Sequence, residues 1–235
     1  MKIENLIDMY ETYKMKFGPD APKKISMLFA EAKDSHRKEF LNSKTAQKAR
    51  AAGRRPDHEQ SWRAFKGKNL EKLILHIIKS EVEALGLKIV DGNKLERTEG
   101  SKLSQELSEV KRSLQVDYGK FGAHQPDVDI VIYNPKTSKA IVVISSKVTL
   151  RERIAQTGYW KLKLAADKAT MHIKVYFITP DEDQTLISAP KPVKKGRAIV
   201  ETDLDGTYLI CENDIEESDK VKTFDKFIGD LKRLL

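Results

Sequence analysis

Two aspartates and one lysine in this chain have the types and the spacing that metal-assisted phosphodiester cleavage requires. Asp127 and Asp129 open an apolar run at residues 128–133, and Lys147 follows a second apolar run at residues 140–144. Carboxylate oxygens are good ligands for a hard divalent cation such as Mg²⁺. An ammonium group beside them can steady or deprotonate a water that the metal activates. These residues therefore indicate a phosphodiesterase site, provided that the fold brings them together.

The two apolar runs have the composition of paired strands. The segment between them, Asn134-Pro-Lys-Thr-Ser138, is rich in turn-forming residues, so a hairpin is expected. In that hairpin Asp127 lies opposite Lys147. Asp129 lies opposite Ser145, and residues two apart share a face, so all four converge at one end of the sheet. We expect Asp127 to be the first metal ligand, with Asp129 as the alternative on the same face.

At these residues the chain resembles the PD-(D/E)xK nuclease superfamily, with Pro126-Asp127 as the first part of the motif and Ser145-Ser146-Lys147 as the second. The serine departs from the acid that usually stands two residues before the lysine. That departure resembles a group of type II restriction endonucleases that cut sites containing CC and GG (CCGG, CCNGG and CCWGG). Members of this group carry Ser-x-Lys and then Arg-(Asp/Glu)-Arg, which is Arg151-Glu152-Arg153 here.

The resemblance also directs attention to a helix expected at residues 62–85, before the hairpin. In the superfamily this helix often brings a glutamate to the metal site, and Gly67-Lys-Asn-Leu-Glu71 resembles that arrangement. Glu71 lies at the edge of the helix's apolar stripe, whereas Glu81 falls near its middle. A carboxylate in an apolar stripe must be paired or bound to metal. We expect Glu71 to act in catalysis and metal binding, with Glu81 as a rival and an exposed surface charge as the alternative for either.

The serine at position 145 leaves the third metal ligand open. In the resembling group a glutamate from the helix after the lysine reaches back to replace the missing acid, but the corresponding positions here hold Trp160 and Lys161. The remaining candidates are Glu71, Glu81 and Gln156, whose amide oxygen could contact metal or water.

The motif Arg151-Glu152-Arg153 has a base-reading interpretation of its own. Arginine forks bind guanine O6 and N7, and a carboxylate can accept from the cytosine N4 amino group. Two arginines with a glutamate between them thus match two successive G·C pairs, and the resemblance implies that they read the CC and GG dinucleotides. The alternative is a solvated helix start with self-paired charges.

Residues 1–55 are expected to form a small helical N-terminal appendage, with residues 56–235 as the catalytic domain. The appendage ends in a basic run that includes Lys48, Arg54 and Arg55. Such a run is usually a solvated helix end or linker, but here an arm contacting the DNA backbone is nearly as well supported, with Gln156 as a further backbone contact.

The remaining elements fit an α/β class fold, a restriction-endonuclease-like α/β/α sandwich around a mixed sheet. Helices are expected at residues 2–17, 23–41, 104–114, 150–164 and 221–235, and strands at 87–90 and 173–178. Asp205-Gly206 is expected to be the turn of a second hairpin, between residues 198–201 and 207–210.

Composition adds weaker constraints. Lys and Arg outnumber Asp and Glu by 43 to 35, which gives a net charge of +8 and favours a polyanionic partner. A single cysteine, Cys211, excludes an intrachain disulfide and fits a reducing cytoplasm. No apolar run approaches a membrane span, and the first residues lack the apolar core of a signal peptide.

Together these features predict a Mg²⁺-dependent type II restriction endonuclease that cuts double-stranded DNA at a short palindrome containing CC and GG. A homodimer is expected, because a palindrome presents two symmetric half-sites. The alternatives are a structure-specific or repair nuclease of the same fold, or a non-catalytic DNA-binding protein.

Overall fold

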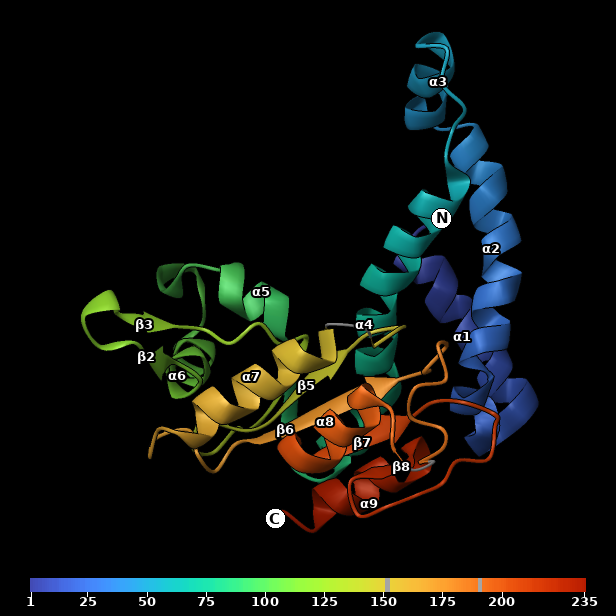
Figure 1. Cartoon of the computed structure of the whole chain (residues 1–235). Helices are drawn as coiled ribbons and strands as arrows, with labels where there is room; N and C mark the ends of the chain where they lie inside the picture. The colour runs from blue at the N-terminus through green and yellow to red at the C-terminus, as the bar shows by residue number, and fades with distance from the viewer. Residues whose placement is uncertain (151–152, 190–191) are drawn as a thin grey trace.

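A six-stranded mixed sheet forms the centre of the molecule in the computed structural model, which describes residues 1–150, 153–189 and 192–235 (Figure 1). The strands lie in the order β1-β4-β5-β6-β7-β8; β1, β4 and β5 are antiparallel, and β5 to β8 are parallel. Their bounds are β1 (Lys88–Asp91), β4 (Ile130–Asn134), β5 (Lys139–Ser146), β6 (Lys174–Thr179), β7 (Gly206–Leu209) and β8 (Val221–Thr223).

Alternate residues along the strands enter two separate cores, one on each face of the sheet. Ile130, Ile132 and Ile144 pack on one face, while Val131 and Val143 pack on the other. The first face is covered by α1 (Ile3–Phe17), α2 (Ile25–Leu41), α4 (His58–Ala84) and α9 (Phe227–Lys232). The second is covered by α5 (Gly92–Arg97), α6 (Gln105–Ser113), α7 (Arg153–Ala165) and α8 (Lys195–Asp203). The predicted α/β/α sandwich is confirmed.

The N-terminal helices α1 and α2 share a hydrophobic core with α4 and one face of the sheet. Leu6 and Tyr10 of α1 and Leu28 and Phe29 of α2 are buried in the same core as α4 and the sheet. The short helix α3 (Lys44–Ala51) lies at the far end of an arm that α2 and the first half of α4 build (Figure 1). The helical nature of residues 1–55 is as expected, while a domain boundary at residue 55 stays a prediction.

The predicted hairpin is present, and its register near the open end agrees with the sequence. Ile130 pairs with Ile144 and Val131 with Val143, and an irregularity follows between Ile132 and Tyr133. Strand pairing of β4 begins at Ile130, and the Asp129 N–H still donates to the Ile144 carbonyl of β5 at 3.0 Å.

The second predicted hairpin, at Asp205-Gly206, is wrong. Residues 198–201 belong to helix α8, and β7 lies parallel between β6 and β8. The Asp205 carboxylate accepts a hydrogen bond from the Val175 backbone N–H at 2.9 Å and pairs with Lys161 at 2.6 Å. A Cβ at Gly206 would lie 3.3 Å from the Tyr176 ring. Asp205 therefore serves a tertiary hydrogen bond and ion pair, and Gly206 a close approach to the Tyr176 ring; neither forms a two-residue hairpin turn.

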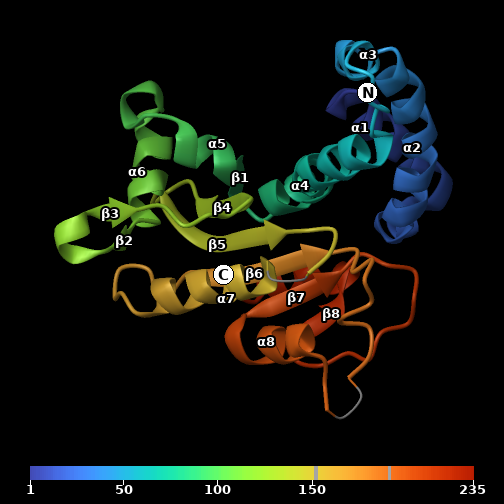
Figure 2. The same cartoon turned by 45° about the horizontal axis from the view of Figure 1, so that its top comes forward.

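Two other expectations are corrected in part. The expected helix at residues 221–235 is strand β8 followed by a short 3₁₀ turn (Phe224–Lys226) and α9. A small two-stranded sheet of β2 (Val116–Asp117) and β3 (Ala123–His124) replaces part of the expected loop before the hairpin, and Figure 2 shows it projecting beside α6.

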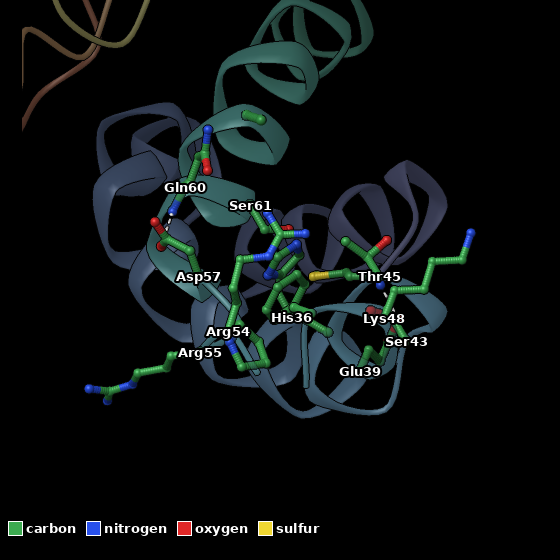
Figure 3. A pocket seen from close by; sticks show the side chains of 15 residues that line it. His36, Glu39, Ser43, Thr45, Lys48, Arg54, Arg55, Asp57, Gln60 and Ser61 are labelled. Carbon is green, nitrogen blue, oxygen red and sulfur yellow. Dashed lines mark hydrogen bonds and ion pairs between the residues drawn. The ribbon is translucent and has the colours of Figure 1, made fainter. Parts of the chain in front are cut away.

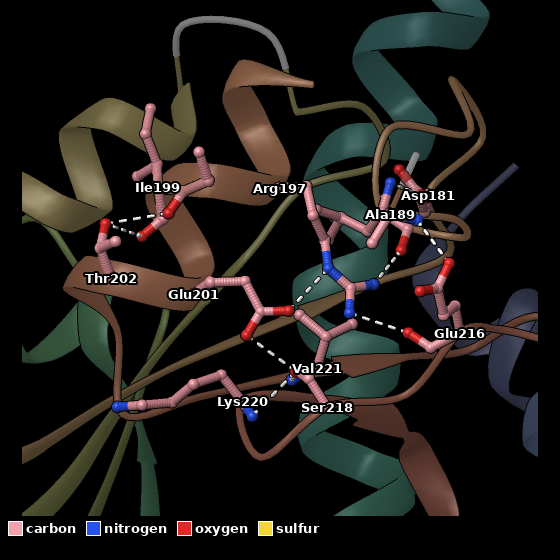
Figure 4. Close-up of polar contacts among 12 residues, drawn as sticks. Asp181, Ala189, Arg197, Ile199, Glu201, Thr202, Glu216, Ser218, Lys220 and Val221 are labelled. Atoms are coloured by element: carbon pink, nitrogen blue, oxygen red, sulfur yellow. Dashed lines mark hydrogen bonds and ion pairs between the residues drawn. The ribbon is translucent and has the colours of Figure 1, made fainter. Parts of the chain in front are cut away.

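A buried arginine connects α8 to the long loops that surround it. Arg197 is 1% exposed and donates to Glu201 Oε1 at 2.7 Å, to the Glu216 carbonyl at 2.8 Å and to the Leu186 carbonyl (Figure 4). The other oxygen of Glu201 accepts from the Ser218 hydroxyl at 2.8 Å. One guanidinium group thus holds three chain segments together.

Replacing Arg197 by Met should lower the free energy of unfolding by about 3 kcal/mol, because the Leu186 and Glu216 carbonyls lose the guanidinium group that donates to them. Urea denaturation measures this change. The matched control is Arg233→Met, since Arg233 is 77% exposed in its ion pair with Asp230. That control should change stability by less than about 1 kcal/mol. Equal stabilities for the two variants would contradict a structural role for Arg197.

Candidate active site

Two carboxylates and one lysine from three separate elements meet at the carboxyl end of β5. The Lys147 Nζ atom donates to both Asp129 oxygens, at 2.7 and 2.9 Å, and to Glu71 Oε1 at 3.0 Å. Glu71 comes from the middle of α4, and Asp129 immediately precedes β4. Asp129 is only 4% exposed, whereas Glu71 and Lys147 are half-buried and face a cleft. This group of residues is called the carboxylate–lysine cluster below.

Backbone contacts fix the position of Asp129. The Ser146 N–H donates to Asp129 Oδ2 at 2.6 Å, and the Gly92 N–H donates to the Asp129 carbonyl at 2.9 Å. A Cβ at Gly92 would lie 2.2 Å from the Val128 carbonyl oxygen, so only glycine allows this approach. The start of α5 is therefore held against the residues that precede β4, and the Asp129 side chain is directed toward Lys147.

Burial and charge perturb the pKa values within the cluster. Burial, together with the neighbouring Asp129 charge, raises the pKa of Glu71 to about 7, although Lys147 opposes this effect. Burial by itself would lower the pKa of Lys147, but the charges and hydrogen bonds of Asp129 and Glu71 outweigh it, so the pKa is raised. The lysine is thus an ammonium ion at neutral pH, and two acidic groups compete for it.

The prediction that Asp127 lies beside Lys147 is wrong. Asp127 is exposed, and its Oδ2 atom accepts from the Gln156 side-chain amide at 2.8 Å. The strand pairing that would have carried it to Lys147 ends at Ile130, and the contact of Gly92 with residues 128 and 129 holds the second aspartate in its place. Asp129, the alternative on the same face, occupies the position instead.

Glu81 is also far from the cluster, whereas Glu71 lies where it was expected. Glu81 is exposed, and its place ten residues after Glu71 on α4 puts it about 15 Å farther along the helix axis. It borders a different groove, with Tyr10 and Phe224. Helical periodicity placed it in the apolar stripe, but the stripe rotates around a helix of this length, so Glu81 reaches solvent.

The cluster forms one side of a cleft of about 630 Å³ whose other polar walls are mostly basic. The basic residues that line it are Arg63, Lys68, Lys72, Lys94, Arg97 and Arg153. Six basic side chains beside two carboxylates suit the binding of a polyanion that must approach a metal-binding centre. Sequence reasoning missed the first five. Lys68 could have been found, because it lies three residues before Glu71 on α4 and so shares a helix face with it, and Lys72 lies four residues after Lys68.

Only part of the predicted base-reading motif can be located. Arg151 and Glu152 lie outside the described residues. Arg153 is the first residue of α7, is exposed and lines the same cleft as Glu71 and Lys147.

The predicted basic arm borders a second hollow, of about 870 Å³, between α2, α3 and the start of α4. Figure 3 shows Arg54 over the centre of this hollow near Ser61, with Arg55 and Lys48 extending to opposite sides. Ala64 of α4 borders both this hollow and the active-site cleft. The two hollows therefore adjoin one another at Ala64 of α4.

The donor atoms of the cluster fit a divalent cation. Asp129 and Glu71 offer carboxylate oxygens around one point, which is the chemistry that Mg²⁺ requires. Within residues 1–150, 153–189 and 192–235, no group of three or more His, Cys, Asp or Glu side chains is arranged to hold a metal ion. Two carboxylates are thus what the described acidic residues supply.

Comparison with known proteins places this site in a family. Residues 106–230, more than half of the chain, match the family described as BsaWI restriction endonuclease type 2. The chain belongs to this family. It is a type II restriction endonuclease, as the sequence resemblance implied. The matched region contains Asp129 and Lys147 but not α4 with Glu71.

Relatives support the assignment along most of the chain. A Methanocaldococcus jannaschii protein named as type II restriction enzyme MjaVIP is 35% identical over 207 residues, covering 84% of this chain and 89% of that protein. A Helicobacter pylori protein named as type II restriction enzyme HpyAORF263P is 30% identical over 182 residues, covering 76% and 90%.

Three solved structures share the fold. A complex of the restriction endonuclease PspGI with substrate DNA has a TM-score of 0.56 at 15% identity and covers 100% of this chain and 96% of that one. An AgeI–DNA complex has a TM-score of 0.53 at 15% identity, covering 99% and 91%. A BsaWI–DNA complex has a TM-score of 0.50 at 17% identity, covering 99% and 90%. Among the helices described, none is long and apolar enough to cross a membrane.

Proposed function

We propose that this restriction endonuclease hydrolyses double-stranded DNA in a Mg²⁺-dependent reaction at a short palindrome containing CC and GG, and that it acts as a homodimer. The main support for this proposal is the carboxylate–lysine cluster, in which Lys147 lies within 3.0 Å of both Asp129 and Glu71 at the edge of a basic cleft.

Each residue of the cluster has a separate task in this proposal. Asp129 and Glu71 would hold the cation, and their contacts with Ser146 and Lys147 keep the two carboxylates in position. Lys147 holds the attacking water by its ammonium group and offsets the negative charge that grows on the phosphate. The cation, when bound, polarises the scissile phosphate and lowers the pKa of a coordinated water.

The walls of the cleft suit DNA. Lys68 and Lys72 of α4 and Arg97 of α5 can each neutralise a phosphate, and such contacts position the duplex without reading its sequence. Lys48, Arg54 and Arg55 extend the same basic surface along the arm. Gln156 of α7 is proposed as a further backbone contact; in the free protein its amide donates to Asp127.

Base reading is assigned to Arg151, Glu152 and Arg153 by residue chemistry and by the family resemblance. The three solved relatives are complexes of restriction endonucleases with DNA, which supports a duplex as the ligand of this fold. A palindromic site presents two half-sites, and one cluster can cut one strand at a time, which favours two copies of the chain acting on one site.

Incubation of purified protein with plasmid DNA tests the proposal. Discrete fragments should form in Mg²⁺ and not in EDTA, and sequencing of the fragment ends should give a palindrome containing CC and GG. Smears or nicks would point to a less specific nuclease, and a mobility shift without cutting to a binding protein. Sedimentation of the protein with an uncut oligonucleotide in Ca²⁺ should give two chains per duplex.

Replacing Arg153 by Ala should lower specific cleavage about tenfold to a hundredfold, because one bidentate contact to guanine is worth about 1–3 kcal/mol. Binding to DNA without the site should change much less. Arg233→Ala is the control, since Arg233 lies on the C-terminal side of α9, outside the cleft. Equal losses on specific and nonspecific DNA would show that Arg153 contacts only phosphate.

A further inference from the structure

An asparagine lies beside both carboxylates of the carboxylate–lysine cluster. The side-chain amide of Asn93 lies with Nδ2 3.4 Å from Glu71 Oε2 and 3.5 Å from Asp129 Oδ1. It is half-buried and lines the cleft. Asn93 is therefore the one amide side chain among the described residues that contacts both carboxylates.

The backbone around Asn93 holds it there. Asp91 caps α5 by accepting from the Lys94 N–H at 2.9 Å, and the Gly92 N–H donates to the Asp129 carbonyl. The absence of a side chain at Gly92 lets the first turn of α5 approach residues 128 and 129. The same contact that orients Asp129 thus presents Asn93 to the cluster.

The cluster lacks a third oxygen donor that the chemistry calls for. Ser145 stands where an acid is usual, and Trp160 and Lys161 stand where the resembling group has a compensating glutamate. Lys161 is paired with Asp205, remote in sequence from the cluster. Gln156, the amide expected to help, is paired with Asp127. Asn93 remains, next to both acids.

An asparagine amide can serve two purposes at one place. Its NH₂ group donates to carboxylates, and its carbonyl oxygen is a ligand for hard cations. Half a turn about the terminal side-chain bond exchanges Nδ2 for Oδ1 without moving the backbone. In the free protein the NH₂ group faces the two carboxylates that Lys147 also contacts, while a metal cation bound by these carboxylates would attract the amide oxygen instead.

We propose that the carbonyl oxygen of Asn93 is the third protein ligand of the divalent cation held by Asp129 and Glu71. This inference rests on the proposed function and adds to it the ligand that takes over from the missing acid. Asn93 also explains why two acidic residues suffice, because a neutral oxygen completes the set without adding a third negative charge.

Calorimetric titration with Mn²⁺, without DNA, tests the assignment by a readout other than activity. Asn93→Ala should bind Mn²⁺ about tenfold or more weakly than the wild type, and Asn93→Asp should bind at least as tightly, because a carboxylate can replace an amide oxygen as ligand. The Mg²⁺ concentration that gives half-maximal cleavage should rise in the Ala variant and not in the Asp variant. Glu96→Ala, an exposed residue on the same helix, is the control and should bind like the wild type.

The outcomes separate this inference from the proposed function. If Asn93→Ala binds Mn²⁺ as the wild type does while Asp129→Asn does not, the cation site stands and the assignment of Asn93 falls. If Asn93→Asp loses binding as Asn93→Ala does, Asn93 acts only as a hydrogen-bond donor and the ligand assignment is again wrong. If the wild type binds no Mn²⁺, or Asp129→Asn binds it normally, the cation site itself is refuted. Thermal melts of each variant exclude misfolding as the cause of a loss.

Discussion

Asp129→Asn should reduce DNA cleavage by at least about a thousandfold, whereas Asp127→Asn should leave it within about threefold of the wild type. The first substitution removes a charged oxygen from the cation and from Lys147, which costs about 4 kcal/mol or more of transition-state stabilisation. The second removes only an exposed carboxylate whose partner is Gln156. Cleavage of plasmid under single-turnover conditions in Mg²⁺ measures both.

The pair is well matched, because both residues are aspartates two positions apart and both changes are isosteric. Asp129→Asn keeps an oxygen that can accept from the Ser146 N–H, so the local fold should survive. DNA binding in Ca²⁺ and thermal melting check this point. Loss of activity in Asp127→Asn with retention in Asp129→Asn would reverse the assignment and restore the arrangement expected from the sequence.

Lys147→Met should also reduce cleavage by at least about a thousandfold. The ammonium group that steadies water and offsets phosphate charge is removed, while a side chain of similar length fills its place. Asp129 and Glu71 then face one another without the ammonium group that contacts both of them. Because Lys147 lowers the pKa of Glu71, its removal should raise that pKa further. Any residual activity should therefore increase with pH over a range above neutrality.

Lys139→Met is the control for this substitution, since Lys139 is an exposed residue at the other end of the same strand. It should cleave like the wild type. Lys147→Arg keeps the charge but not the compact ammonium group, and it should recover only part of the activity. Single-turnover rates measured from pH 6 to pH 9 separate the loss of charge from the shift in Glu71. Cleavage by Lys147→Met within tenfold of the wild type would exclude a role for the lysine in the reaction.

The sequence by itself determined the group of restriction endonucleases, the hairpin with its register near the open end, and the placement of Glu71 beside Lys147. These features are local. A buried strand reveals itself by a short continuous run of apolar, β-branched residues, and Glu71 by its place at the edge of a helical stripe. A lysine that ends an apolar strand is unusual enough to be noticed without a structure.

Tertiary structure alone decided which aspartate joins Lys147 and which further residues surround it. Asp127 and Asp129 are two residues apart and would share one face of an ideal strand, so no local pattern distinguishes them. The structure decides between them, because Asp129 is bonded to β5 and to Gly92 at the start of α5, whereas Asp127 pairs with Gln156. The contact between Gly92 and Asp129 also brings Asn93 next to the carboxylates. Such close approaches between segments depend on backbone atoms and on the absence of a side chain, and neither leaves a periodic signal in the sequence.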